Sequence, residues 1–191
     1  MASAAETVKK VALELGGKNP HIIFADADLD LAARLVAIAG FGLTGQACTA
    51  TSRVIVERSV ADAFTAKLIE KAKAIVVGNG LKTGVTMGPA VSKAQLEGNL
   101  NYVAIAQQEG ASLLCGGGRL SDGDLAHGYF MQPTVLGNVK PAARIACEEV
   151  FGPVVGIIPV DGFDEALAVA NSVDVGLSAS LVTRDLKKAM L

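Results

Sequence analysis

Apolar and polar positions alternate along the chain in blocks that predict helices and strands in turn. Residues 60–75 place apolar side chains at Val60, Phe64, Leu68 and Ala72, close to the roughly 3.6-residue period of an amphipathic helix. Because charged residues such as Lys67 and Lys71 lie between these positions, one face of this helix is expected to pack on a core. Helices are also expected over residues 29–41, 92–109 and 163–170.

Short apolar runs bounded by glycine, proline or acidic residues predict the strands. They cover residues 11–15, 21–24, 53–57, 111–115, 130–136, 154–160 and 177–182. Strands that alternate with helices of this length favour a parallel sheet packed between helices. The expected fold is therefore one α/β domain over residues 1–191, with a mostly parallel sheet and helices on both faces. A short helix is also expected near the start, where Ser3 and Glu6 have the spacing of a capping box.

The composition narrows the possible functions. Seventeen basic and nineteen acidic residues give a net charge of −2 without a basic block, which disfavours nucleic-acid binding. The longest uncharged stretch, residues 35–52, holds too many Gly, Thr and Gln residues for a membrane span, and no secretory signal is visible. Three widely spaced cysteines with no CxxC pair disfavour a disulfide framework or a zinc site and indicate a cytoplasmic protein.

Common catalytic and nucleotide-binding patterns are absent from the sequence. There is no GxGxxG at a helix start and no GxxxxGK[ST], and the triplet at residues 116–118 leads into a polar loop, which favours a turn. His21 and His127 have no Ser or Cys partner in a recognisable motif, so a Ser-His-Asp arrangement has little support. No metal site is expected.

Cys48 is the remaining candidate nucleophile. It lies between a predicted helix and a predicted strand, and small residues flank it, so a substrate could approach closely. From the residues alone, a lone cysteine is more often a small buried hydrophobic side chain than a nucleophile. Cys115, in a strand pattern, is expected to be buried and inert, whereas the sequence does not assign a role to Cys147.

Three motifs decide between these interpretations of Cys48. Residues 41–53, FGLTGQACTATSR, resemble the cysteine motif of the aldehyde dehydrogenase family. Residues 13–20, LELGGKNP, resemble its glutamate motif, and residues 148–153, EEVFGP, resemble its cofactor-facing motif. Glu14 and Cys48 are 34 positions apart (48 − 14), similar to the family spacing. The resemblance extends from about Val8 to the end of the chain and implies an aldehyde dehydrogenase catalytic-domain-like fold.

The resemblance also implies a mechanism. The thiolate of Cys48 attacks the aldehyde to form a thiohemiacetal, hydride leaves for NAD or NADP, and water hydrolyses the thioester. The Cys48 N–H contributes to an oxyanion hole, and Glu14, in an apolar setting, is the general base for the water or the thiol. Glu149 accepts hydrogen bonds from the nicotinamide ribose, Phe151 packs beside the nicotinamide, and Gly16 completes the cofactor-binding set. Without the motif, Glu14 and the Glu148–Glu149 pair would be solvated residues at strand ends.

Two further residues are expected to support the site. Lys18 is a candidate ion-pair partner, and Arg53 is a candidate structural contact behind the cysteine loop.

Family members are more than twice as long as this chain, so the N-terminal cofactor-binding domain and the C-terminal oligomerisation segment are expected to be absent. The substrate class is a small aldehyde, with a weak resemblance to semialdehyde dehydrogenases, and a homo-oligomer is expected. The alternative is a non-catalytic folded fragment with a structural or assembly role.

Overall fold

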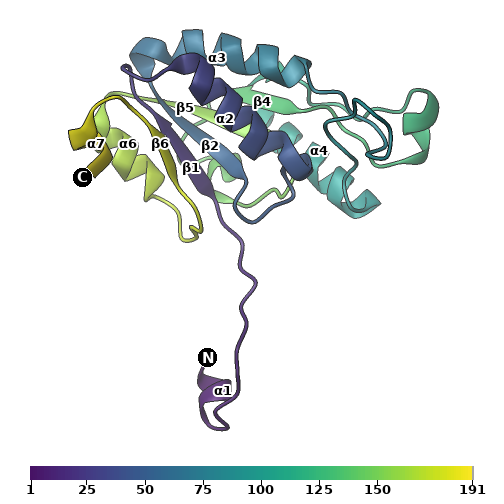
Figure 1. Cartoon of the computed structure of the whole chain (residues 1–191), viewed down its shortest axis with the longest axis horizontal. Coiled ribbons are helices and arrows are strands. Elements are labelled where there is room, and N and C mark those ends of the chain that lie inside the picture. The colour runs from purple at the N-terminus through teal and green to yellow at the C-terminus, as the bar shows by residue number, and fades with distance from the viewer. Residues whose placement is uncertain (191) are drawn as a thin grey trace.

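The computed structural model describes residues 1–190, which form a six-stranded sheet with the order β3-β4-β5-β2-β1-β6 (Figure 1). Every pair of neighbouring strands is parallel except β3 and β4. The strands are β1 (Asn19–Ile23), β2 (Thr51–Glu57), β3 (Ser112–Cys115), β4 (Thr134–Gly137), β5 (Val154–Val160) and β6 (Ser180–Val182). The prediction of an α/β fold with a mostly parallel sheet is confirmed.

Helices cover both faces of the sheet, as the sequence predicts. The longer helices are α2 (Leu29–Phe41), α3 (Arg58–Lys73), α4 (Lys93–Gln108) and α6 (Phe163–Ala170). Apolar residues of α2 and α3 form one buried cluster with side chains of β1, β2 and β5, including Val36 and Phe64. Residues of α4 and α6, among them Leu96 and Ala166, form a second cluster with other side chains of the same strands. Since successive side chains of a strand point to opposite faces, one sheet separates the two cores.

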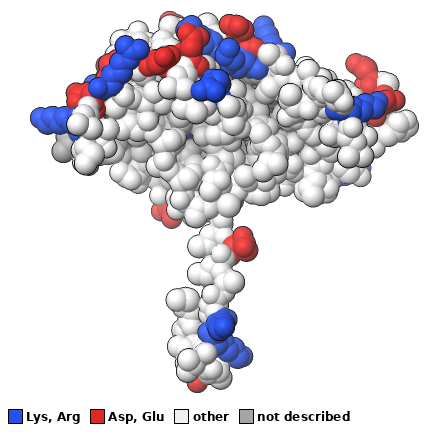
Figure 2. All heavy atoms as spheres, in the orientation of Figure 1, with Lys and Arg blue, Asp and Glu red and all other residues white. Residues whose placement is uncertain are grey.

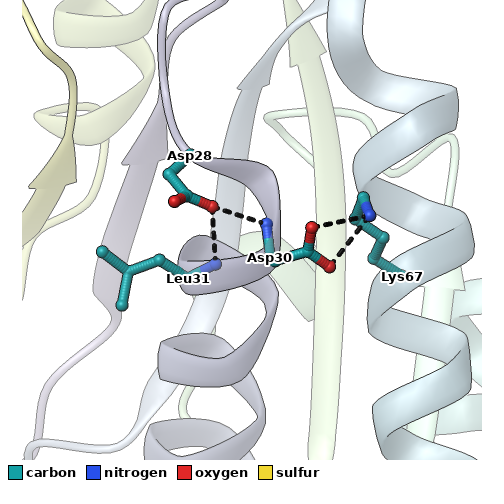
Figure 3. Close-up of polar contacts among 4 residues, drawn as sticks. All are labelled: Asp28, Asp30, Leu31 and Lys67. Carbon is teal, nitrogen blue, oxygen red and sulfur yellow. Dashed lines mark hydrogen bonds and ion pairs between the residues drawn. The ribbon is translucent and has the colours of Figure 1, made fainter.

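The Asp28 side chain caps the start of helix α2, and an ion pair between Asp30 and Lys67 links α2 to α3 (Figure 3). The Asp28 side chain accepts hydrogen bonds from the N–H groups of Asp30 and Leu31, 3.1 Å each, which satisfies donors that a helix start leaves unpaired. The Asp30 carboxylate in turn accepts from Lys67 Nζ at 2.8 and 2.9 Å. The predicted helix start at residue 29 is therefore correct.

The N-terminal segment projects away from the sheet (Figures 1 and 2). It begins with a single helical turn, α1 (Ala2–Ala5), which has no side-chain cap, so the expected capping box does not form. The predicted strand over residues 11–15 is also wrong, because this segment is extended but pairs with no strand. Its apolar side chains are exposed: Val11 by 45%, Leu13 by 59% and Leu15 by 60%. An alternating pattern predicts a strand only where a neighbouring strand supplies hydrogen bonds.

Other differences from the predicted elements are small. Strands β4 and β6 are shorter than expected, since the segments before them, residues 130–133 and 177–179, run as irregular chain. Short helical elements that were not predicted or only outlined are η1 (Gly42–Gly45), η2 (Gly123–His127), α5 (Arg144–Cys147) and α7 (Leu186–Met190). Within residues 1–190 no helix is long and apolar enough to cross a membrane.

Candidate active site

Three segments that are distant in the sequence meet at the amino-terminal edge of three adjacent strands. Gly17 precedes β1, Cys48 precedes β2, and Phe151 precedes β5, and these strands lie side by side in the order β5-β2-β1. Because the three strands are parallel, the residues before them emerge at the same edge. The sequence motifs around Gly16, Cys48 and Glu149 are thus brought together by the sheet itself.

A backbone donor joins the first of these segments to the third. The Gly17 N–H donates to Glu149 Oε1 at 3.2 Å. A Cβ atom at Gly16 would lie 2.0 Å from Glu149 Oε2, so only glycine lets the carboxylate approach the chain this closely. The narrow cleft between the segments is lined by Gly17, Ala47, Glu149 and Phe151, among others.

The two acidic residues of the third segment have different surroundings. Glu148 accepts hydrogen bonds from the Tyr102 hydroxyl at 2.6 Å and from Arg144 Nε at 2.8 Å. The hydrogen bond from Arg144, followed by that from Tyr102, lowers the Glu148 pKa to about 2. Glu149 is exposed and accepts only the Gly17 N–H within residues 1–190, so its carboxylate keeps acceptor capacity for a ligand. Phe151 is 38% exposed and has a left-handed backbone, with a φ of 56°.

The loop before Cys48 has an unusual backbone. Leu43, Thr44 and Gly45 have φ angles of 51°, 62° and 64°, so two side-chain-bearing residues adopt the left-handed conformation in succession. Each such residue costs on the order of 1 kcal/mol, and surrounding contacts must hold it in place. Two of these contacts are the Thr44 hydroxyl donating to the Gly88 carbonyl at 3.2 Å and the Gln46 side chain accepting the Val91 N–H at 2.8 Å.

Cys48 is half-buried at the end of this loop and carries a free thiol. Its carbonyl oxygen accepts a hydrogen bond from Asn19 Nδ2 at 2.7 Å. Within residues 1–190 the Cys48 N–H makes no hydrogen bond. Asn19 was not singled out by the sequence, and its burial, at 2% exposure, and its bond to the cysteine loop are visible only in the structure.

Arg53 and Lys18 form a buried basic pair beneath these segments. Arg53 is 1% exposed and donates to the Lys18 carbonyl at 3.1 and 2.8 Å and to the carbonyls of Val169 and Ala170 at 2.9 Å each, which confirms its structural role. Burial, and to a lesser extent the nearby Arg53 charge, lower the Lys18 pKa to about 7. Lys18 forms no ion pair within residues 1–190, so the ion-pair expectation is not met.

The remaining predicted residues lie in less defined surroundings. Glu14 is exposed, two positions before Gly16, where the projecting segment leaves the sheet, so the expected apolar setting is wrong for the described residues. Cys115 is half-buried in β3 rather than fully buried. Cys147 is also half-buried, and its thiol donates to the Pro141 carbonyl at 3.4 Å.

A larger cavity of about 560 Å³ lies away from these residues, between the loop at residues 77–89 and the segment at residues 124–130. Its charged side chains, Lys82 and Asp124, form an exposed ion pair with each other at 2.5 Å. Because this cavity contains no cysteine and its charges are already paired, it does not compete with the edge around Cys48 as the candidate active site.

Comparisons with known proteins agree with these observations. The profile of the aldehyde dehydrogenase family matches residues 1–191. The chain is 48% identical over 181 residues to the alpha-ketoglutaric semialdehyde dehydrogenase of Bacillus subtilis (strain 168). It is 51% identical over 182 residues to the alpha-ketoglutarate semialdehyde dehydrogenase of Haloferax volcanii. Each alignment covers 95% of this chain but only 37% of the relative, so the chain spans little more than a third of their length.

Solved structures show the same relationship. Betaine aldehyde dehydrogenase from Staphylococcus aureus in complex with NAD+ is similar to 99% of this chain, with a TM-score of 0.93 and 41% identity, and the match covers 37% of that protein. Lactaldehyde dehydrogenase from Escherichia coli is similar with a TM-score of 0.91 and 38% identity, covering 99% of this chain and 39% of that protein. By sequence and by fold, this chain belongs to the aldehyde dehydrogenase family.

Proposed function

We propose that this chain forms the single, cysteine-bearing domain of an NAD(P)-dependent aldehyde dehydrogenase that oxidises an aldehyde to a carboxylate. The observation that carries this proposal is the convergence of Gly17, Cys48 and Glu149 on one edge of the sheet, with the Gly17 N–H bonded to Glu149. The two relatives named as semialdehyde dehydrogenases support a semialdehyde as the substrate class. The predicted cytoplasmic location and homo-oligomeric state belong to the same proposal.

Cys48 is the proposed nucleophile. Its thiolate attacks the aldehyde carbon, a C–S bond forms, and the carbonyl π electrons move to the oxygen. The Cys48 N–H, which has no partner within residues 1–190, donates to the resulting oxyanion. In two solved structures of the S. aureus relative, the same cysteine is free of BME in one and modified by BME in the other. This difference supports a reactive thiol in the family.

Gly16, Glu149 and Phe151 are the proposed cofactor contacts. The exposed carboxylate of Glu149 retains acceptor sites for ribose hydroxyls, and the exposed ring of Phe151 offers an apolar surface to a flat base. Gly16 keeps the chain close to Glu149, because any side chain there would collide with the carboxylate. A nicotinamide dinucleotide, when bound, supplies the hydride acceptor that turns the thiohemiacetal into a thioester.

Glu14 is the proposed general base for hydrolysis of the thioester. It lies two residues from Gly16, and its exposed position gives the carboxylate access to the water that it deprotonates. Attack of this water on the thioester carbon breaks the C–S bond, releases the carboxylic acid product and regenerates the Cys48 thiolate.

A non-catalytic folded fragment is the second candidate. Two observations favour it: Glu14 is exposed on a segment that packs on no strand, and the chain spans 37% of its relatives. Hydrolysis of p-nitrophenyl acetate by the 191-residue chain separates the candidates, because this reaction requires the cysteine and water but no hydride acceptor. The proposed enzyme hydrolyses the ester, Cys48→Ser abolishes hydrolysis, and Glu14→Gln slows deacylation, whereas Glu6→Gln, an exposed acid on the same segment, has no effect.

A further inference from the structure

Side chains hold three consecutive carbonyl groups of the cysteine loop. Asn19 Nδ2 donates to the carbonyl oxygens of Cys48 at 2.7 Å and Ala50 at 2.9 Å. The Ser178 hydroxyl donates to the carbonyl between them, that of Thr49, at 3.2 Å. Residues from two distant parts of the chain thus fix the backbone at the cysteine and at the two residues that follow it.

Asn19 itself can adopt only one orientation. Its Oδ1 accepts the N–H groups of Ser178 at 2.9 Å and Leu177 at 3.4 Å, while both Nδ2 hydrogens go to the cysteine loop. Rotating the amide by half a turn would point Oδ1 at two carbonyl oxygens and Nδ2 at two N–H groups. Asn19 is 2% exposed and begins β1, so water cannot replace these bonds.

The direction of the free N–H groups follows from these bonds. In a trans peptide the C=O and N–H groups point in opposite directions. The Ala50 N–H donates to the Ala47 carbonyl at 2.9 Å, which fixes the direction of the Cys48 N–H. Asn19 holds the Cys48 carbonyl and so fixes the direction of the Thr49 N–H. Neither of these two N–H groups makes a hydrogen bond within residues 1–190.

We infer that Asn19 and Ser178 are positioning residues for Cys48, which aim two N–H groups at the oxygen of a bound acyl group. Asn19 aims the Thr49 N–H by holding the Cys48 carbonyl. Ser178 holds the Thr49 carbonyl and thereby orients the Ala50 N–H, whose bond to the Ala47 carbonyl aims the Cys48 N–H. The inference rests on the proposed function, because it assumes acyl transfer at Cys48. Both residues act through the loop backbone and do not touch the substrate. Preorganised donors of this kind accelerate acyl transfer because they need no reorganisation as the charge develops.

Comparing two reactions of the same thiol distinguishes positioning from a structural role. Acetylation of Cys48 by p-nitrophenyl acetate passes through an oxyanion, whereas its alkylation by iodoacetamide does not. Both rates are measured by mass spectrometry of the Cys48 peptide in the 191-residue chain. If the N–H donors no longer point at the oxyanion, acetylation slows and alkylation does not. If the loop as a whole becomes disordered, the rates of acetylation and alkylation change together.

The main variant is Asn19→Asp, which keeps an acceptor for Ser178 but loses both donors to the loop. We expect Cys48 acetylation to slow about tenfold or more, part of the roughly 10²–10³ effect of removing an oxyanion donor. Alkylation should change less than about threefold. Ser178→Ala removes only the bond to Thr49 and should slow acetylation about threefold. Asp28→Ala removes a helix cap at the far end of α2, roughly 20 Å along its 13 residues, and should change neither rate.

The possible outcomes separate the inference from the proposed function. Equal slowing of acetylation and alkylation in folded Asn19→Asp, or no change in either, would overturn the positioning role alone. If Asn19→Asp does not fold, Ser178→Ala decides in the same way. Acetylation of Cys115 or Cys147 in place of Cys48 in the unmodified chain would overturn the proposed function, and the positioning role with it.

Discussion

Gly45 packs against Gly152 so closely that a Cβ atom at residue 45 would lie 2.2 Å from the Gly152 carbonyl oxygen. Gly45 also has a φ of 64°, in the region that favours glycine. This contact joins the loop of Cys48 to the segment that carries Glu149 and Phe151. Two of the three segments at the candidate active site therefore meet at a position where no side chain fits.

Gly45→Ala should destabilise the fold by at least about 2 kcal/mol, since it adds both a collision with backbone and strain at a positive φ. Gly42→Ala is the matched control, because a Cβ there meets no atom within 4 Å and its φ is −55°. It should change stability by no more than about 0.5 kcal/mol. Urea unfolding midpoints measure both, and equal midpoints would show that the close packing of residues 45 and 152 is not required.

Acid should destabilise the chain through His21. This histidine is 3% exposed, and burial lowers its pKa from 6.5 to about 4. Between these two pH values the unfolded chain binds a proton that the folded chain does not, so stability falls as the pH falls from 6.5 to 4. The contribution is at most about 3 kcal/mol.

The control for this pH dependence is the other histidine. His21→Asn should flatten the decrease in stability between pH 6.5 and 4, whereas His127→Asn, at an exposed position, should leave it unchanged. The measurement is the urea midpoint across the pH range. A His21→Asn variant with the same pH dependence as the unmodified chain would rule out His21 as the group responsible.

The sequence predicts the elements best where the local signals are strong. Helix α2, strand β5 and helix α6 have the predicted bounds, because an aspartate cap, an all-apolar run and a preceding glycine mark their ends. The strand expected at residues 11–15 fails because alternation says nothing about whether a neighbouring strand exists. Similarly, the antiparallel pairing of β3 with β4 depends on contacts between segments, and the periodicity of one segment carries no information about its neighbours.

The candidate site shows the same division. The motif resemblance predicts that Gly16, Cys48 and Glu149 belong to one site, and the parallel strands β1, β2 and β5 place the three segments at the same edge of the sheet. Asn19 donates to the Cys48 carbonyl across 29 positions and accepts the Ser178 N–H across 159 positions. No local pattern identifies bonds over such separations, so these positioning residues are found only in three dimensions.

The 191-residue chain alone should not reduce NAD or NADP at a useful rate. The proposed cofactor contacts in this chain are three residues, Gly16, Glu149 and Phe151, and binding energy from the rest of the dinucleotide is needed to hold the nicotinamide at the thiol. Absorbance at 340 nm measures reduction, with ester hydrolysis as the control for an intact thiol. Robust NADH formation by the purified chain would contradict this prediction.

The chain should also associate with itself. Strands β3 and β6 each pair on one side only within residues 1–190, and apolar side chains such as Leu13 and Leu15 are exposed. Figure 2 shows charged side chains gathered away from the face from which the N-terminal segment projects, and a net charge of −2 offers little repulsion. Light scattering over a dilution series should show masses above 19.5 kDa, whereas a constant mass of 19.5 kDa at high concentration would contradict it.

The identity of the reactive cysteine tests the central claim most directly. The three free thiols, Cys48, Cys115 and Cys147, are all half-buried, so exposure alone does not favour one of them. Limiting iodoacetamide followed by peptide mass spectrometry gives their relative labelling rates. We predict that Cys48 is labelled first and that Cys48→Ser abolishes ester hydrolysis, whereas faster labelling of Cys115 or Cys147 would contradict the assignment of Cys48 as the nucleophile.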